Sequence, residues 1–429
     1  MSWTFDLVHE PWIPCVDKSG RERHLGLMEA LAAAHELVEI RDDSPVVTAS
    51  LHLLLLAILH RVHDGPKNRK EWQAIWKEGR FERGWLDTYF RTWADRFDLF
   101  HPTFPFYQTA GFEKVDSKGK SAPSQVARLA LELASGNNPT LFDHTREAEP
   151  LSASPAEVAR WLVANQSFSV GGGKSGSSRQ YGEHPNFTHA PMVGGLACFL
   201  TGGNLFETLV LNLVYYNGSP GSGMPLPVPE GDMPAWERVA ARKPVPTRKP
   251  DGLLDLLTWQ TRHIRLVPET TPSGSTFVAW MHYGHAGGVP WASTDGLQNP
   301  YWAYRAHDDG LRAVGVNVGR AAWRDSDAMF VSATNSGTEF RPVAMKQVAS
   351  LVVRGDIDNP NLGCMAIGLV NDKAKVETWR LDRFGVPANL AADDVLSQAL
   401  RNGLTLAEQA GKALSSSFFI VSKQLSGAA

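Results

Sequence analysis

Apolar positions along the chain follow helical spacing in some segments and strand spacing in others. Residues 42–45 begin a segment that stays apolar almost all round as far as His63, which predicts a long buried helix. Short apolar runs with strand character come later, at residues 264–267, 276–280, 345–353 and 362–370. This mixture favours an α+β fold, with a large, irregular, mixed α/β globular body and a C-terminal helical region.

The C-terminal region is predicted to be helical from Asp393 onward. Residues 404–425 form one amphipathic pattern, and a single helix cannot bury its own apolar stripe. We therefore divide the chain into a globular body, residues 1–395, and the first helix of a C-terminal helical bundle region, residues 396–429. That helix is expected to dock on the body, on a partner or on further helices.

The overall charge limits how the chain can meet nucleic acid. Forty-two Lys and Arg residues stand against 45 Asp and Glu residues, so the net charge is near zero. Proteins that coat nucleic acid alone are usually basic. Any DNA contact should therefore be local, or supplied partly by a partner.

Cysteine use and hydropathy point to a cytoplasmic protein. Cys15, Cys198 and Cys364 lie far apart and form no C-x-x-C pair, so neither a disulfide framework nor a zinc knuckle is expected. No apolar stretch is predicted to span a membrane, and the N-terminus does not resemble a signal peptide. We expect no metal, no cofactor and no membrane partner.

A glycine run, Gly171-Gly172-Gly173-Lys174-Ser175-Gly176, is the most distinctive short motif. Three glycines without side-chain bulk can reach positive φ and let a backbone approach a ligand closely, and Lys174 adds a charge suited to phosphate. A nucleotide-binding P-loop is not matched, because that motif needs glycine where Phe168 stands and must open a helix. Two interpretations stay open: a backbone against nucleic acid, or a flexible surface loop.

Two other segments could carry binding groups. Asn371, Asp372 and Lys373 lie between two strand-like runs and predict the tip of a β-hairpin, which serves either as a wedge or as a solvated turn. The loop 137–146 surrounds one aromatic residue, Phe142. Phe142 could meet a nucleobase or a protein groove, or it could anchor the loop to the core.

Motifs for catalysis are not found in the sequence. It contains no H-E-x-x-H, no G-x-S-x-G and no paired-cysteine metal site. His282 and His285 form an isolated H-x-x-H, which core or surface histidines explain better than a metal site. Binding is therefore favoured over chemistry.

An ordered set of segments resembles the CasA family, the large subunit of the type I-E CRISPR surveillance complex Cascade. The segments are distributed in this order along nearly the whole chain: residues 5–14, His101-Pro102 with 106–109, 137–142, 171–176 and 371–373. The resemblance implies recognition of the target-flanking motif (PAM) in double-stranded DNA within an RNA-guided antiviral complex. It implies as partners the guide RNA, the other Cascade subunits, the target DNA and a recruited helicase–nuclease.

The resemblance also assigns roles to residues of this sequence. The glycine segment, Gly171, Gly172, Gly173, Lys174 and Ser175, would lie against the minor groove of the flanking motif, where readout is degenerate and depends on shape. Asn371, Asp372 and Lys373 would form a wedge that separates the first target base pair. The loop with Asn137, Asn138, Thr140 and Phe142 would meet the 5′ end of the guide RNA and anchor the subunit.

Three departures from the family pattern limit this transfer. The best-known wedge of the family has glutamine where this chain has Lys373, so the steric role carries over better than a particular hydrogen bond. Residues 277–285, which match the position of a lysine finger, contain no lysine, and His282 is a weak replacement. Family members end in a four-helix bundle, of which residues 404–425 would supply the first helix.

The resemblance favours a subunit without catalytic activity. Two other functions are kept: a purely structural scaffold of the complex, and a nucleotide hydrolase that uses the Gly-Lys-Ser loop.

Overall fold

The structure is a computed structural model, and it leaves several segments of the 429-residue chain undescribed. Its descriptions cover residues 3–133, 150–174, 176–216, 230–239, 241–291, 297–308, 310–331, 341–357, 361–372, 374–387, 390 and 393–426. The predicted guide-RNA loop, with Asn137, Asn138, Thr140 and Phe142, lies outside them, as do Ser175 and Lys373.

Helix α2 (Pro45–Val62) is the centre of the hydrophobic core. Every residue from Val46 to His60 is buried. Its polar side chains bond to backbone carbonyls: the Ser50 hydroxyl donates to Val46 (2.7 Å), and His52 Nδ1 lies 2.8 Å from the carbonyl oxygen of Thr48. By length and composition this helix could cross a membrane, which the sequence analysis did not expect, but 83% of it is buried inside the protein.

Helix α5 (Pro155–Phe168) packs against α2 and leads toward the glycine run. A capping box fixes its start: the Glu157 amide donates to Ser154 Oγ (3.3 Å), and the Ser154 amide donates to the Glu157 carboxylate (2.8 Å). The remaining helices are α1 (Leu27–Ala32), α3 (Arg69–Glu78), α4 (Arg83–Thr92), α6 (Leu205–Asn212), α7 (Leu253–Leu257), α8 (Ser326–Phe330), α9 (Val343–Val353) and α10 (Asp394–Leu425).

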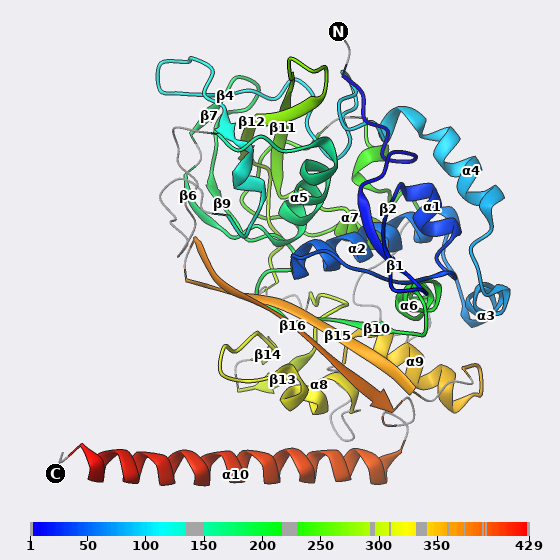
Figure 1. Cartoon of the computed structure of the whole chain (residues 1–429), viewed down its shortest axis with the longest axis vertical. Coiled ribbons are helices and arrows are strands. Elements are labelled where there is room, and N and C mark those ends of the chain that lie inside the picture. Colours follow the sequence, from blue (N-terminus) through cyan, green and yellow to red (C-terminus); the bar gives the residue numbers. More distant parts are fainter. Residues whose placement is uncertain are drawn as a thin grey trace.

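The strands form several small antiparallel sheets (Figure 1). One has the order β2 (Glu22–Leu25), β1 (Ile13–Asp17), β3 (Leu37–Ile40), and another β11 (Arg262–Thr270), β12 (Thr276–His285), β5 (Ser124–Gln125). Smaller sheets pair β4 (Lys114–Val115), β7 (Ser177–Ser178) and β8 (Gly182–Glu183); β6 (Gly172–Lys174) and β9 (Asn186–Phe187); β13 (Tyr304–His307) and β14 (Gly310–Ala313).

A long hairpin, drawn in orange in Figure 1, crosses the molecule. It consists of β15 (Asn361–Asp372) and β16 (Lys375–Pro387), and β10 (Ala197–Thr201) pairs with the other edge of β15. The strands stay paired from Asn361↔Pro387 to Asp372↔Lys375, with one irregularity between Val370 and Asn371. The predicted hairpin at residues 371–373 is therefore confirmed.

Helix α10 runs along the lower edge of the molecule in Figure 1 and extends past the body. Glu408 ties it to the body through Arg320 (3.2 Å) and Arg324 (3.5 Å). Apolar side chains on its later turns are exposed, among them Phe418 and Phe419. The predicted C-terminal helix is confirmed, whereas the division of the chain at residue 395 stays a prediction.

The α+β class is confirmed, with one segment assigned wrongly. Residues 264–267, 276–280 and 362–370 are strands as predicted, but residues 345–353 belong to helix α9. A short apolar run does not distinguish a buried strand from a buried helix. Helix α9 begins directly after Pro342 and packs against α6, α8 and β10.

Two buried histidines and one that is half-buried predict that the fold loses stability in acid. Burial lowers the pKa of His52 and His63 to about 4, and of His60 to about 3. Below pH 6.5 the unfolded chain binds protons at these rings while the native chain does not, so the free energy of unfolding falls as the pH falls. Each ring contributes a slope of about 1.4 kcal/mol per pH unit until its native pKa is reached.

Urea unfolding at pH 7.5, 6.5 and 5.5 measures this slope. The variant His63→Phe keeps a ring beside Phe81 and Trp85 but removes one titrating group, and it should reduce the slope by about one proton. An unfolding free energy that does not change over this pH range would contradict the prediction.

Candidate nucleic-acid interface

The glycine run forms an edge strand and not a loop that opens a helix. Strand β6 follows the end of α5 and pairs with β9, with Gly172 opposite Phe187 and Lys174 opposite Asn186. The next element is β7, so the helix that a P-loop requires is not there. The glycine run therefore lies between a helix and an extended segment.

The three glycines of the run have different surroundings. A Cβ atom on Gly171 would lie 3.0 Å from the carbonyl oxygen of Phe187, and one on Gly172 would lie 2.6 Å from the Cβ atom of Ala374. Around Gly173 no described atom comes within 4 Å of that position. None of the three has positive φ, contrary to the conformational reason that the sequence suggested. Close approach explains Gly171 and Gly172, and Gly173 faces open space.

The contact between Gly172 and Ala374 joins the two segments that the sequence singled out. Ala374 lies in the turn of the β15–β16 hairpin, next to Asp372 and Lys375, which are paired and exposed. Asn371, one residue earlier, is half-buried. Two segments that are about 200 residues apart in the chain thus form one continuous surface, which we call the glycine–hairpin edge and define as residues 171–174 with 371, 372, 374 and 375.

A buried arginine supports this edge from below. Arg262, at the start of β11, is 1% exposed, and its Nη2 donates to the carbonyl oxygens of Val170 (2.9 Å) and Thr188 (3.0 Å). Val170 precedes the glycine run and Thr188 follows β9, so one guanidinium group ties both sides of the β6–β9 pair. Within the described residues Arg262 has no carboxylate partner.

Aromatic rings and a second arginine surround this buried charge. The Arg262 guanidinium carbon lies 4.6 Å from the centroid of the Phe187 ring, and that of Arg128 lies 5.1 Å from the same centroid. Arg262 Nε also donates to the Tyr283 hydroxyl (3.1 Å). Burial, together with the charge of Arg128, lowers the pKa of Arg262. Among the described residues neither arginine has a carboxylate partner, so the two charges give the interior next to β6 a positive potential, which favours anions nearby.

His189 fixes the first glycine. The Gly171 amide donates to His189 Nδ1 (3.0 Å), which requires that this nitrogen carry no proton. Burial, followed by the positive charge of Arg262, lowers the pKa of His189 and so keeps the ring neutral. Neither Arg262 nor His189 stands out in the sequence, because each lies in an ordinary polar position of a short strand or loop.

The H-x-x-H pair lies in the protein interior. His282 is 4% exposed and accepts a hydrogen bond from the Lys114 amide (3.1 Å), while His285 Nε2 lies 2.7 Å from the carbonyl oxygen of Val245. Among the described residues no cluster of three or more His, Cys, Asp or Glu side chains could hold a metal ion. The interpretation of these histidines as core residues is confirmed, and burial makes His282 a poor replacement for a lysine finger.

Comparison with known proteins identifies the class: the chain is a CRISPR-associated protein. Residues 6–428 match the family model described as CRISPR-associated protein Cse1. The chain therefore belongs to the Cse1 family, also called CasA, as the resemblance implied. A CasA/Cse1 protein of Thermus thermophilus is 34% identical over 420 residues, which is 96% of this chain and 76% of that relative.

Solved structures agree with this family assignment. Cse1 from Acidimicrobium ferrooxidans has a TM-score of 0.81 at 26% identity, covering 96% of this chain and 77% of that one. CasA from T. thermophilus has a TM-score of 0.75 at 29% identity, covering 98% and 83%. A chain from a CRISPR RNA-guided surveillance complex matches with a TM-score of 0.77 at 23% identity, covering 98% of this chain and 84% of that one, which shows a shared fold.

The Gly172–Ala374 contact predicts a compensating pair of substitutions. Gly172→Ala should lower the free energy of unfolding by about 1–3 kcal/mol, because the new methyl group overlaps Ala374. Ala374→Gly in the same chain removes the overlapping atom and should restore most of that loss. Thermal unfolding of the two single variants and the double variant gives the coupling energy, and additive effects would contradict a direct contact.

Loss of the Arg262 hydrogen bonds should allow the β6–β9 strand pair to open locally. Arg262→Lys keeps the charge but cannot reproduce the forked hydrogen bonds to Val170 and Thr188. Amide hydrogen exchange in residues 170–174 and 186–190 should accelerate at least tenfold. Arg265→Lys is the matched control, because Arg265 lies on the same strand and donates to the carbonyl of Phe112 instead. Equal exchange in both variants would contradict the assigned role.

Proposed function

We propose that this chain is the large subunit of a type I-E Cascade surveillance complex, and that it recognises the flanking motif of double-stranded target DNA. The single observation that carries the proposal is the glycine–hairpin edge, in which the backbone at Gly172 packs against the hairpin turn at Ala374. The segment that recognises the groove and the segment that separates the strands must act on neighbouring base pairs. The contact between the glycine strand and the hairpin turn places the two segments side by side, as this requires.

The open side of β6 suits a close approach by DNA. Around Gly173 there is no described atom within 4 Å of a Cβ position, so a groove wall can come up to the backbone. The minor groove offers a degenerate pattern of hydrogen-bonding groups, and a close backbone reads its shape and its A·T or G·C character. Lys174 would contact a phosphate or a groove edge, and the positive potential from Arg262 and Arg128 would add to this attraction.

The hairpin tip would separate the first base pair of the target. Strands β15 and β16 are paired along their whole length, and β10 adds a third strand, so the tip is held by a stiff base. Asp372 and Lys375 are exposed there, and Asn371 and Lys373 complete the predicted wedge. We assign the wedge a steric role, since an exposed carboxylate repels phosphate and would not hold a strand by charge.

The partners follow from the same proposal. Near-neutral net charge fits a subunit that gains affinity from the guide RNA and neighbouring subunits. The chain would act in the cytoplasm without catalytic activity and would recruit a helicase–nuclease to the opened target. The loop with Phe142 would anchor it at the 5′ end of the guide RNA.

The two alternatives make different demands on the glycine segment. A nucleotide hydrolase needs a helix start after the Gly-Lys-Ser run, whereas β7 follows it. A scaffold would need the glycine–hairpin edge for assembly of the complex and not for DNA recognition. Loss of assembly on substitution of Gly173 would favour the scaffold.

The decisive variant is Gly173→Asp. Its side chain enters open space, so the fold should persist, while a carboxylate would repel phosphates at the groove. Gly172 is unsuitable because any side chain there meets Ala374. We expect the guide-loaded complex with Gly173→Asp to bind duplex target with the correct flank at least tenfold more weakly, measured by gel shift or interferometry.

Gly385→Asp is the matched control. Gly385 is also a strand glycine without positive φ and without a described atom within 4 Å, and it lies on β16 far from the hairpin turn. Its substitution should leave target binding unchanged. A scrambled flank should weaken the unsubstituted complex and have little further effect on Gly173→Asp. Equal binding by Gly173→Asp and the unsubstituted complex would overturn the assignment.

A further inference from the structure

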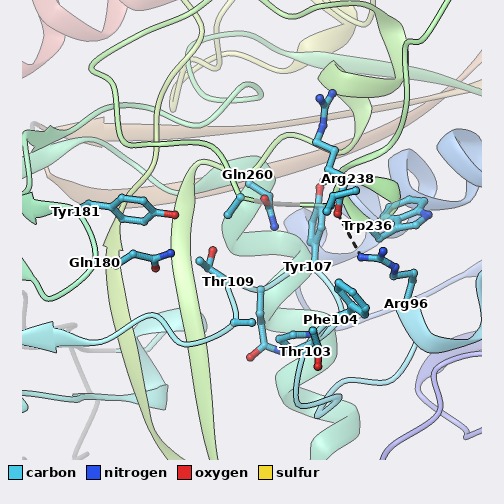
Figure 2. Close-up of a pocket in the computed structure, with 16 residues that line it drawn as sticks. Arg96, Thr103, Phe104, Tyr107, Thr109, Gln180, Tyr181, Trp236, Arg238 and Gln260 are labelled. Carbon is cyan, nitrogen blue, oxygen red and sulfur yellow. Dashed lines mark hydrogen bonds between the residues drawn. The ribbon is translucent and has the colours of Figure 1, made fainter.

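A surface cavity of about 200 Å³ lies apart from the glycine–hairpin edge (Figure 2). Its lining comes from residues 103–110, from Gln180 and Tyr181, and from residues 235–239 with Ala241. Arg96 and Gln260 complete it. An engineered cavity of roughly 150 Å³ in another protein accepts benzene, so this volume admits one planar ring system with substituents.

Aromatic side chains line much of the cavity. Trp236 and Tyr107 are buried in its wall, and Phe104 lies at one side. On the opposite side Tyr181 stacks on His263, with ring centroids 4.8 Å apart, and its hydroxyl points into the cavity (Figure 2). Such rings offer flat faces for a planar ligand.

Two carboxamides supply hydrogen-bonding edges. Gln180 and Gln260 enter the cavity from different segments, as Figure 2 shows. Neither side chain, nor the Tyr181 hydroxyl, has a hydrogen-bond partner in the described part of the chain. A carboxamide carries donors and an acceptor side by side, which is the arrangement on the edge of a nucleobase.

Arg96 is a cation in the cavity that could pair with an anionic ligand. The Arg96 guanidinium lies 3.5 Å from the centroid of the Phe104 ring and donates to the carbonyl oxygen of Arg238 (3.3 Å). Across the described residues it has no carboxylate partner, whereas Arg238 is paired with Asp255 (3.0 Å). The lining contains no aspartate or glutamate. A ligand with a negative group is therefore favoured, because no carboxylate in the lining repels it.

The backbone at the cavity is strained. Tyr107 has φ of +58°, one of few such non-glycine residues in the described chain. Left-handed backbone at a bulky residue is uncommon, and it is found more often at ligand sites than elsewhere. It places the Tyr107 ring in the cavity wall, where the hydroxyl donates to the carbonyl oxygen of Trp259 (3.3 Å).

We propose that this cavity binds a single nucleotide of a single-stranded nucleic acid. The base lies among the rings of Tyr181, Phe104 and Trp236 with its edge on the two carboxamides, and its phosphate pairs with Arg96. The site goes beyond recognition of duplex DNA at the glycine–hairpin edge, because it requires an unpaired, extruded base. Ribonucleotides and deoxyribonucleotides share this chemistry.

Photocrosslinking of mononucleotides to the full-length chain tests the proposal. The probes are 4-thiouridine monophosphate and 4-thio-2′-deoxyuridine monophosphate, and the adducts are located by mass spectrometry. We expect at least one probe to label Tyr181, Phe104 or Trp236, and unlabelled uridine monophosphate to compete. The stronger of the two probes identifies the sugar type that the cavity accepts.

Variants separate this site from the glycine–hairpin edge. Arg96→Met should weaken binding of uridine monophosphate at least tenfold, and Arg83→Met, at an exposed arginine outside the lining, should not. Because Arg96 also packs on Phe104, Gln180→Leu gives a second test at an exposed residue. Gly173→Asp should keep full crosslinking, so failure of the duplex proposal leaves this result intact.

Three outcomes would overturn the proposal. They are the absence of adducts on the lining residues, equal nucleotide affinity of both lining variants and the unsubstituted chain, and competition by inorganic phosphate as strong as that by uridine monophosphate.

Discussion

The architecture around the candidate interface depends on one steric constraint, the close packing of Gly172 against Ala374. A Cβ atom at Gly172 would stand 2.6 Å from that of Ala374, closer than such atoms approach in proteins, so only glycine permits this distance. The constraint joins the end of a central helix, through β6, to the turn of a hairpin from the last third of the chain. Without it, the two candidate DNA-binding segments would be separate surfaces.

Beneath this contact, the protein accepts an unusual electrostatic arrangement. A buried guanidinium group normally has a carboxylate partner, because desolvation of an isolated charge is costly. Arg262 relies instead on backbone carbonyls, a tyrosine hydroxyl and an aromatic face. The positive charge of Arg262 therefore raises the electrostatic potential at the nearby surface, where the phosphates of a bound nucleic acid would neutralise it. The neutral ring of His189 belongs to the same arrangement, since the field of Arg262 helps to keep the proton away.

Local features of this fold were predictable from the sequence, and long-range ones were not. The buried helix at 45–62 and the turn at 371–373 follow from apolar spacing and turn residues, which act over a few positions. The assignment of 345–353 failed because an apolar run of that length fits a strand or a helix equally well. Contacts such as Gly172 with Ala374 depend on how distant elements pack. Arg262 was missed because burial of a charged residue in a strand leaves no local pattern.

The number of paired residues in the β15–β16 hairpin sets the distance between its base and its turn. Its base is fixed where a Cβ atom at Gly363 would lie 2.1 Å from Thr201 Oγ1 on β10, and its turn is fixed against Gly172. One added residue in each strand would move the turn about 3.4 Å and exchange the two faces of the hairpin. Two added residues would keep the faces but move the turn about 7 Å. Only insertions of an even number of residues in each strand would keep the faces of the hairpin. Even these would move the turn away from Gly172 and break its contact with the glycine strand.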